Sequence, residues 1–318
     1  MRALLAACLS LGLAACATLR APPVATSTPA PVVATPNAVS EPLSRAVGRT
    51  PVVTPTAIPR AVATPTALVR APVLNGLLDG VLPEDAGSDY ALVLEDLASG
   101  ARTAINADAA LPSASLYKLG VAWAVMRQVD AGLLRQDAVL TIEDDDAVEP
   151  EPDGGFGVGD TPSVRDALAA MLSVSSNASA HALLRVLGRD AFTAEMDRIG
   201  LHQTRVPDDS LATTSAADIA RLLRLIATSP ELSAASRSVI AQAMGSIAPP
   251  DALRDTLPEG VGIFDKTGNL EDASNVGALL ETPRATAILV VIDTGVDPGD
   301  ARAIIAQAGQ IAYHALLQ

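Results

Sequence analysis

Two hydrophobic periods alternate along the chain from Tyr90 onwards. The runs 90–97 and 102–106 are rich in aliphatic residues and flank the sequence ASG, so they predict two strands joined in a hairpin with Gly100 in the turn. Apolar residues then follow at helical spacing in four segments, which cover 115–134, 163–173, 178–187 and 191–199. Gly188 and Gly200 end the last two of these predicted helices.

The C-terminal third returns to strand patterns. Ser215 followed by Asp218 resembles a capping box that opens a helix over AADIARLLRLI. Three strand-like runs come next, VGIFDKTG, SNVGALLE and TAILVVID, and an Ala-rich helix from Pro298 closes the chain. Strands at both ends with helices between them imply one sheet assembled from distant segments, with a helical subdomain inserted.

Residues 1–15 have the pattern of an export signal. Arg2 is the whole basic region, and an apolar run of 13 residues follows from Ala3 to Ala15, which is too short to span a bilayer as a stable helix. The sequence LAAC, ending at Cys16, resembles the bacterial lipoprotein signal, in which the cysteine is lipidated and becomes the first mature residue. The alternative is an ordinary cleaved signal followed by an incidental cysteine. Cys8 is removed in either case, so no disulfide within the mature chain is expected.

Residues 16–72 are predicted to form a disordered tether, and residues 73–318 the folded domain. Eleven of the 23 prolines fall within 21–72, among repeated Thr-Pro pairs, and no helical or strand period survives there. Fully extended, this segment would reach about 160 Å at about 3.1 Å per residue. It is either a spacer that holds the domain away from a membrane or a linker whose length has no function.

Composition narrows the function classes. A formal charge of −14 and an isoelectric point near 4.5 argue against a nucleic-acid partner, which would call for a basic patch. The three histidines, His181, His202 and His314, have no ligand spacing, and we interpret them as surface or packing residues. No metal and no organic cofactor is expected.

Only two of the 22 basic residues are lysines, Lys118 and Lys266. Arginine does not lose its proton in a protein, so a site that needs a neutral amine must keep lysine. Ser115 and Lys118 are three residues apart at the start of a predicted helix, where they are neighbours and where backbone N–H groups favour developing negative charge. A neutral lysine could take the serine proton, although a first-turn serine is more often a helix cap.

Two further motifs favour a catalytic role for Ser115 over a role as a helix cap. Ser175, Ser176 and Asn177 lie in a break between two predicted helices, and KTG at 266–268 ends a predicted strand. With Ser-x-x-Lys, their order resembles the serine β-lactamases and penicillin-binding proteins, whose motif set is a known pattern. The similarity to the class A β-lactamase domain covers residues 85–318. It implies an α/β (α+β) fold of the β-lactamase/transpeptidase type, with a five-stranded antiparallel sheet, flanking N- and C-terminal helices and an all-helical subdomain.

The resemblance also implies roles for site residues. Ser115 would be the nucleophile, activated by Lys118, and Ser175 would relay a proton to the leaving nitrogen. Asn177 would hold the substrate amide and Lys118. Lys266 and Thr267 would bind the substrate carboxylate, Gly268 would let the substrate lie along the strand edge, and the N–H groups of Ser115 and Asn269 would form the oxyanion hole.

The sequence departs from the family pattern at two places. Ser176 stands where the family usually has Asp, which removes a buried charge that braces the loop. The family's Glu-x-x-Leu-Asn segment, whose glutamate activates the deacylating water, is missing: only RVPDDSLA lies between Thr204 and Thr213. Asp208 or Asp209 could substitute, although a turn after Pro207 explains them as well. The acidic stretch 143–153 is interpreted as a solvated loop that could repel anionic substrates.

Two hypotheses follow for this chain. The first is an exported, membrane-anchored, monomeric serine hydrolase that opens β-lactams, or cleaves D-alanyl-D-alanine-like wall peptides, through an acyl-enzyme on Ser115. The second is a cell-wall or β-lactam-binding protein that keeps the substrate-binding residues but has negligible substrate turnover. Intact Ser115, Lys118, Ser175 and Lys266 favour chemistry, whereas the short loop favours slow release of the acyl group.

Overall fold

The computed structural model describes residues 74, 76–82, 87, 89–208, 210–247 and 251–317. The predicted signal segment, Cys16 and the tether to residue 72 lie outside these residues, as does Asp209. Within the described part, no helix combines the length and the apolar content needed to cross a membrane.

A five-stranded antiparallel sheet forms the centre of the domain, in the order β2-β1-β7-β6-β5. The strands are β1 (Tyr90–Asp96), β2 (Arg102–Ile105), β5 (Gly262–Leu270), β6 (Ala273–Glu281) and β7 (Thr286–Asp293). Gly100, with a φ of +72°, turns the hairpin between β1 and β2. Along its other edge β1 pairs with β7, from Tyr90 opposite Asp293 to Asp96 opposite Ala287. The predicted sheet of distant segments is therefore confirmed.

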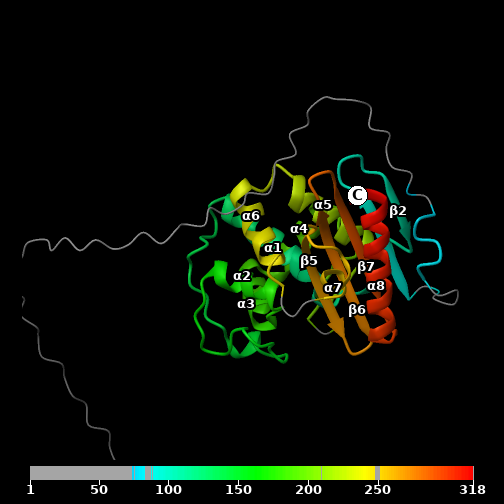
Figure 1. The fold of residues 1–318 in the computed structure, drawn as a ribbon. Helices are drawn as coiled ribbons and strands as arrows, with labels where there is room; N and C mark the ends of the chain where they lie inside the picture. Colours follow the sequence, from blue (N-terminus) through cyan, green and yellow to red (C-terminus); the bar gives the residue numbers. More distant parts are fainter. Residues whose placement is uncertain are drawn as a thin grey trace, which may run out of the picture. The chain divides into compact units, whose positions relative to one another are not determined.

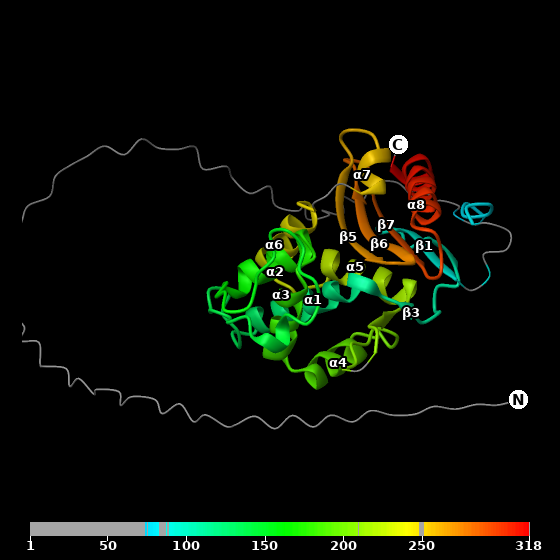
Figure 2. The same ribbon diagram turned by 90° about the horizontal axis from the view of Figure 1, so that it is seen from below.

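Both faces of the sheet are covered, which explains why its central strands are almost continuously apolar. Ala91 and Val93 of β1 pack into the cluster formed by the helical subdomain, while Leu92 and Leu94 pack into a second cluster on the opposite face. The helices α7 (Ala252–Thr256) and α8 (Pro298–Ala312) lie on this second face, and α5 (Ala216–Thr228) lies on the first (Figure 2). A short π-helix, η3 (Tyr313–Leu317), continues α8.

The helical subdomain is gathered beside the β5 edge of the sheet (Figure 1). Its helices are α1 (Lys118–Asp130), α2 (Val164–Ser173), α3 (Asn177–Leu187), α4 (Arg189–Arg198) and α6 (Ala234–Met244). The fully buried Trp123 of α1 fixes α4, because its indole N–H donates to Glu195 at 2.8 Å. The sequence pattern missed α6, which carries few of the large apolar residues that reveal a helical period, and α7, which has only five residues.

Two local features differ from the expectations. The described residues 76–82 form consecutive turns where a helix was expected, with Leu78 and Val81 in the same apolar cluster as α8. A two-stranded sheet was not predicted: β3 (Leu111–Pro112) pairs with β4 (Thr213–Thr214). Strands of two residues leave no periodic signal, yet this pairing brings the segment 205–212 next to the turn that carries Ser115.

Candidate active site

Ser115 lies in η1 (Ala114–Tyr117), a 3-10 turn that leads directly into α1. The predicted continuous α-helix from Ser115 is therefore wrong in its first turn. Ala114 has a φ of +44°, a conformation that costs energy in a residue with a side chain and is found mainly at functional sites. Leu116 and Lys118 are completely buried, whereas Ser115 is half-buried and lines a large cavity.

Ser175 connects the groups of the site. It follows α2 and has a φ of +63°, so its backbone is also held in an unusual conformation. Its hydroxyl donates to Ser115 Oγ at 2.8 Å, and its carbonyl oxygen accepts from Lys118 Nζ at 2.7 Å. The predicted juxtaposition of Ser115, Lys118 and Ser175 is present in the structure.

Both lysines reach Ser115 by way of the Ser175 hydroxyl. Lys118 Nζ donates to Ser175 Oγ at 3.3 Å and to Asn177 Oδ1 at 2.6 Å. Lys266 Nζ donates to the same Ser175 Oγ at 3.1 Å and to the carbonyl of Thr267 at 2.7 Å. The hydroxyl of Ser175 thus lies between two amines and the candidate nucleophile.

The pKa values of both lysines are lower than that of an ordinary lysine. Burial lowers the pKa of Lys118 to about 8, against the opposing effect of the Glu149 and Glu151 carboxylates. Burial, and after it the positive charge of Lys118, lowers the pKa of Lys266 to about 7, opposed by Asp265. A neutral amine is therefore accessible near neutral pH, which a guanidinium at either position would not provide.

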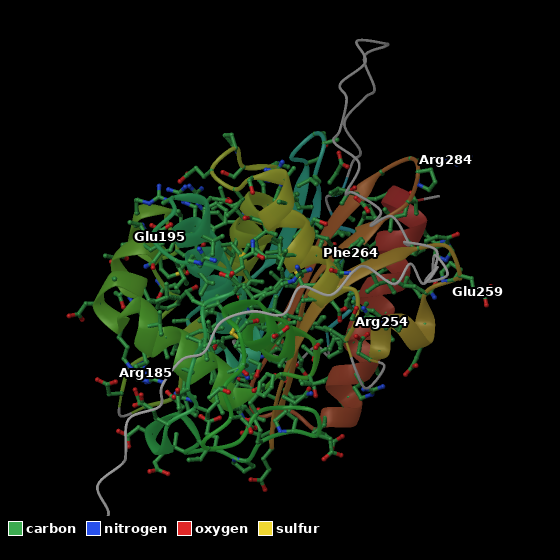
Figure 3. The ribbon with its side chains drawn as sticks, turned by 90° about the vertical axis from the view of Figure 1, so that its left-hand side faces the viewer. Arg185, Glu195, Arg254, Glu259, Phe264 and Arg284 are labelled. Carbon is green, nitrogen blue, oxygen red and sulfur yellow. The ribbon has the colours of Figure 1, made fainter. Side chains whose placement is uncertain are left out.

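The strand β5 presents Lys266, Thr267 and Asn269 to the site, and α7 supports this strand. Arg254 of α7, labelled in Figure 3, bonds Asp251 and Asp265 and donates to the carbonyl of Ile263 at 3.1 Å. These contacts fix the strand immediately before Lys266.

Gly268 is needed for packing within the domain. A Cβ at this position would lie 2.9 Å from the backbone nitrogen of Ser115 and 3.1 Å from the carbonyl oxygen of Ser113. Glycine is therefore required for the close packing of β5 against η1. That it also lets a substrate lie along the strand edge, as the resemblance implied, stays a prediction; Thr267, Asn269 and Leu270 of this strand line the cavity.

The cavity in front of Ser115 has a volume of about 840 Å³. It extends from β5 past Ser175 and Asn177 to the segments 145–152 and 206–212. Several charged or titratable residues line the cavity, and they are Tyr117, Asp145, Glu149, Glu151, His181, Arg189 and Asp208.

The acidic stretch 143–153 is more than a solvated loop. Asp146, in the 3-10 turn η2 (Asp144–Asp146), is only 2% exposed and bonds Arg185 of α3 at 2.7 Å. Glu151 Oε2 accepts from the backbone N–H groups of Asn177 and Ala178, each at 3.0 Å. The prediction of a fully solvated loop is wrong because these carboxylates hold the N-terminus and outer face of α3.

Glu151 also compensates for the missing charge at Ser176. Ser176 Oγ accepts from the N–H of Ser179 at 3.1 Å and caps α3. Glu151, from the loop next to α3, supplies a carboxylate that accepts from the backbone at the start of this helix. The carbonyl oxygen of Pro150, in the same loop, accepts from Asn177 Nδ2 at 2.9 Å. The sequence offered no signal for this exchange, since the two residues are 25 positions apart and only the fold brings them together.

His181 belongs to the cavity wall. Its side chain is 14% exposed, and its Nε2 lies 3.6 Å from Glu149 Oε1. His181 is thus a largely buried residue of the cavity wall, whereas His202 is an exposed residue beside Asp197. A single histidine on a helix carries no ligand spacing that could have revealed the contact.

The shortened segment between Thr204 and Thr213 is held by contacts with α4 and α5. Ser215 Oγ caps α5 as predicted, but the Asp218 carboxylate accepts from the N–H groups of Gln203 and Thr204 and so does not complete the capping box. Asp208 pairs with Arg189 at 2.8 Å and is 83% exposed.

A hydroxyl linked through a second serine to two amines of lowered pKa, at the junction of an antiparallel sheet and a helical subdomain, defines a serine hydrolase of the acyl-transfer type. The chain belongs to the beta-lactamase enzyme family, whose model matches residues 75–316. The resemblance to class A β-lactamase-like serine hydrolases and the β-lactamase/transpeptidase fold are both confirmed.

Solved structures agree with this assignment. The class A β-lactamase reconstructed for the last common ancestor of Gram-negative bacteria is 31% identical, with a TM-score of 0.66, over 72% of this chain and 95% of that one. A β-lactamase from Xanthomonas campestris pv. campestris is 29% identical, with a TM-score of 0.65, over 73% and 93%. PBP-A, at 23% identity and a TM-score of 0.66 over 71% and 89%, shares the fold.

Proposed function

We propose that the protein opens β-lactam rings through an acyl-enzyme on Ser115. The observation that carries this proposal is the hydrogen-bond chain from Lys118 and Lys266 through Ser175 to Ser115, which faces an open cavity. Ser115 Oγ forms a bond to the lactam carbonyl carbon as its proton passes towards Ser175 and the neutral amine. The carbon–nitrogen bond then breaks, and the nitrogen takes its proton from Ser175.

The remaining site residues would bind the substrate. Lys266 and Thr267 offer a cation and a hydroxyl to the substrate carboxylate, and Asn177 offers an amide to the substrate side chain. The backbone N–H groups of Ser115 and Asn269 would stabilise the oxyanion, a contribution that is typically worth several kcal/mol (roughly 3–4) for one donor.

Deacylation is expected to be the slow step. The segment 205–212 contains no glutamate, and its described carboxylate, Asp208, is directed to Arg189. A positioned general base typically contributes about 10²- to 10⁴-fold. The acyl-enzyme should therefore form faster than it is hydrolysed.

The proposal is tested with benzylpenicillin, nitrocefin and intact-mass spectrometry. We expect a stoichiometric adduct within minutes that decays more slowly than it forms, and Ser115→Ala should abolish the adduct while leaving the circular dichroism unchanged. Labelling that persists in Ser115→Ala would refute the nucleophile. If the unaltered protein shows neither adduct nor turnover with any penicillin or cephalosporin, a D-alanyl-D-alanine-like wall peptide or a pure binding role becomes the better proposal.

We further propose that the protein acts outside the cytoplasm as a monomer, anchored to a membrane through a lipid on Cys16. The lipoprotein-like sequence at 13–16 and the Pro-rich segment that follows support this location. Both segments lie outside the described residues.

A further inference from the structure

Glu149 shares the cavity with the candidate nucleophile. Glu149 and Ser115 line the same cavity, together with His181, Tyr117 and Arg189. His181 Nε2 of α3 lies 3.6 Å from Glu149 Oε1 and makes no hydrogen bond within the described residues. The Glu149 side chain is still 54% exposed and can meet solvent.

The charge of Glu149 affects the pKa values of two residues close to Ser115, Tyr117 and Lys118. Burial is the main cause that lowers the pKa of Lys118, and the Glu149 carboxylate is the largest effect that opposes it. Burial also raises the pKa of Tyr117, and Glu149 is the next cause in the same direction. Tyr117 and Lys118 are two and three residues after Ser115, so the carboxylate lies close to the turn that holds the nucleophile.

Two other described carboxylates of the cavity have partners of their own. Glu151 Oε2 accepts two backbone N–H groups at the start of α3. Asp208 is paired with Arg189 and is largely exposed. Asp145, in the turn η2, also lines the cavity and is compared with Glu149 in the experiment below.

We infer that Glu149 is the general base that activates the water for hydrolysis of the acyl group on Ser115. This inference rests on the proposed acyl-enzyme. The water oxygen forms a bond to the ester carbonyl carbon as Glu149 takes one water proton. The bond from that carbon to Ser115 Oγ then breaks, and the proton returns to Ser115 Oγ through Lys118 and Ser175, which leaves Glu149 ionised again.

The position of Glu149 is consistent with slow release of the acyl group. The carboxylate stands on a loop, its side chain is 54% exposed, and its contact with His181 Nε2 is 3.6 Å long, so its orientation is less fixed than that of a buried base. Glu149 thus supports hydrolysis of the acyl group at a rate slower than acylation. It stands on a different loop from the one that carries the base in the resembled enzymes.

The decisive variant is Glu149→Gln, compared with Asp145→Asn and Asp208→Asn, which also remove one charge from the cavity wall. Intact-mass spectrometry follows the formation and decay of the benzylpenicillin adduct, and thermal unfolding checks that each variant is folded. In Glu149→Gln we expect the adduct to decay slower by about 10²-fold, while its formation rate stays within about threefold. The two controls should decay at the rate of the unaltered protein.

The outcomes separate this inference from the proposed function. Unchanged decay in a folded Glu149→Gln variant, or a comparable slowing in Asp208→Asn, overturns the role of Glu149 and leaves the acyl-enzyme intact. If the unaltered protein turns over too fast to trap, the adduct should accumulate only in Glu149→Gln. If the unaltered protein forms no adduct and consumes no penicillin, the proposed function fails, and the role of Glu149 fails with it.

Discussion

Lys118 and Lys266 both donate to the hydroxyl of Ser175, and the positive charge of Lys118 contributes to the lowered pKa of Lys266. Two ammonium groups around one hydroxyl disfavour each other, so the site favours loss of a proton from the pair. This gives a physical reason for keeping lysine at these two positions in a chain that otherwise uses arginine.

Lys118→Arg should impair acylation almost as severely as Lys118→Ala. The guanidinium keeps the charge but cannot act as a base, and its planar fork does not fit the contacts of the ammonium to Ser175 and Asn177. We expect a loss of about 10²-fold or more in the rate of penicillin labelling for both variants. Near-normal labelling of Lys118→Arg would show that a neutral amine is not required.

The acylation rate should rise with pH. Because acylation requires the unprotonated amine, and burial lowers the pKa of Lys118 to about 8, the rate should increase about tenfold per pH unit well below this value and level off above it. Stopped-flow measurements of the nitrocefin burst between about pH 6 and pH 9 would give the profile. A flat profile across this range would contradict the assignment of Lys118 as the base.

At the scale of elements, the contact between β5 and η1 decides where the nucleophile stands. Gly268→Ala should push η1 outward, since the new methyl group would lie 2.9 Å from the backbone nitrogen of Ser115. We expect a loss of about 1–3 kcal/mol in stability and slower acylation. The control is Gly157→Ala, where the new methyl group has ordinary room, 3.9 Å from Asp160 Oδ2. Equal behaviour of the two variants would refute the packing role.

The start of α3 depends on a residue of the neighbouring loop. Glu151→Ala removes the acceptor of the Asn177 and Ala178 N–H groups, which should cost about 1 kcal/mol, comparable to the loss of a helix cap. Because Asn177 Oδ1 bonds Lys118, acylation should also slow, on the order of tenfold for each 1.4 kcal/mol transmitted to the site. Glu151→Gln keeps one acceptor and should be affected less. Penicillin labelling rates and thermal unfolding would distinguish the three proteins.

At the scale of the whole molecule, the catalytic domain and its N-terminal segment pose separate questions. Cys16→Ala should move the protein from the membrane fraction to the soluble fraction, or block its processing, because the lipid is the proposed anchor. Fractionation of cells that express each form, followed by immunoblotting, measures this directly. A variant that still sediments with membranes in the normal amount would show that Cys16 is not the anchor.

The sequence by itself determined the elements with strong periods and the residues with distinctive chemistry. Strand-like runs at 261–268, 274–281 and 286–293 predicted the strands that the structure places at 262–270, 273–281 and 286–293, and the last of them is almost continuously apolar because the sheet is covered on both faces. Two lysines in a chain rich in arginine, Lys118 three residues after Ser115 and Lys266 next to Thr267, pointed to the candidate catalytic cluster, since few other residues can supply a neutral amine. Such features are local, so they can be recognised without knowledge of the fold.

The tertiary structure alone decided which residues complete the site. Glu151 caps a helix 26 positions away, His181 meets Glu149 across the cavity wall, and Gly268 faces the backbone of Ser115. Ser175 becomes the connection between both lysines and the nucleophile only when α2, α1 and β5 are packed together. These contacts join segments whose separation in sequence carries no period, and side-chain distances of about 3 Å are set by packing of the whole domain.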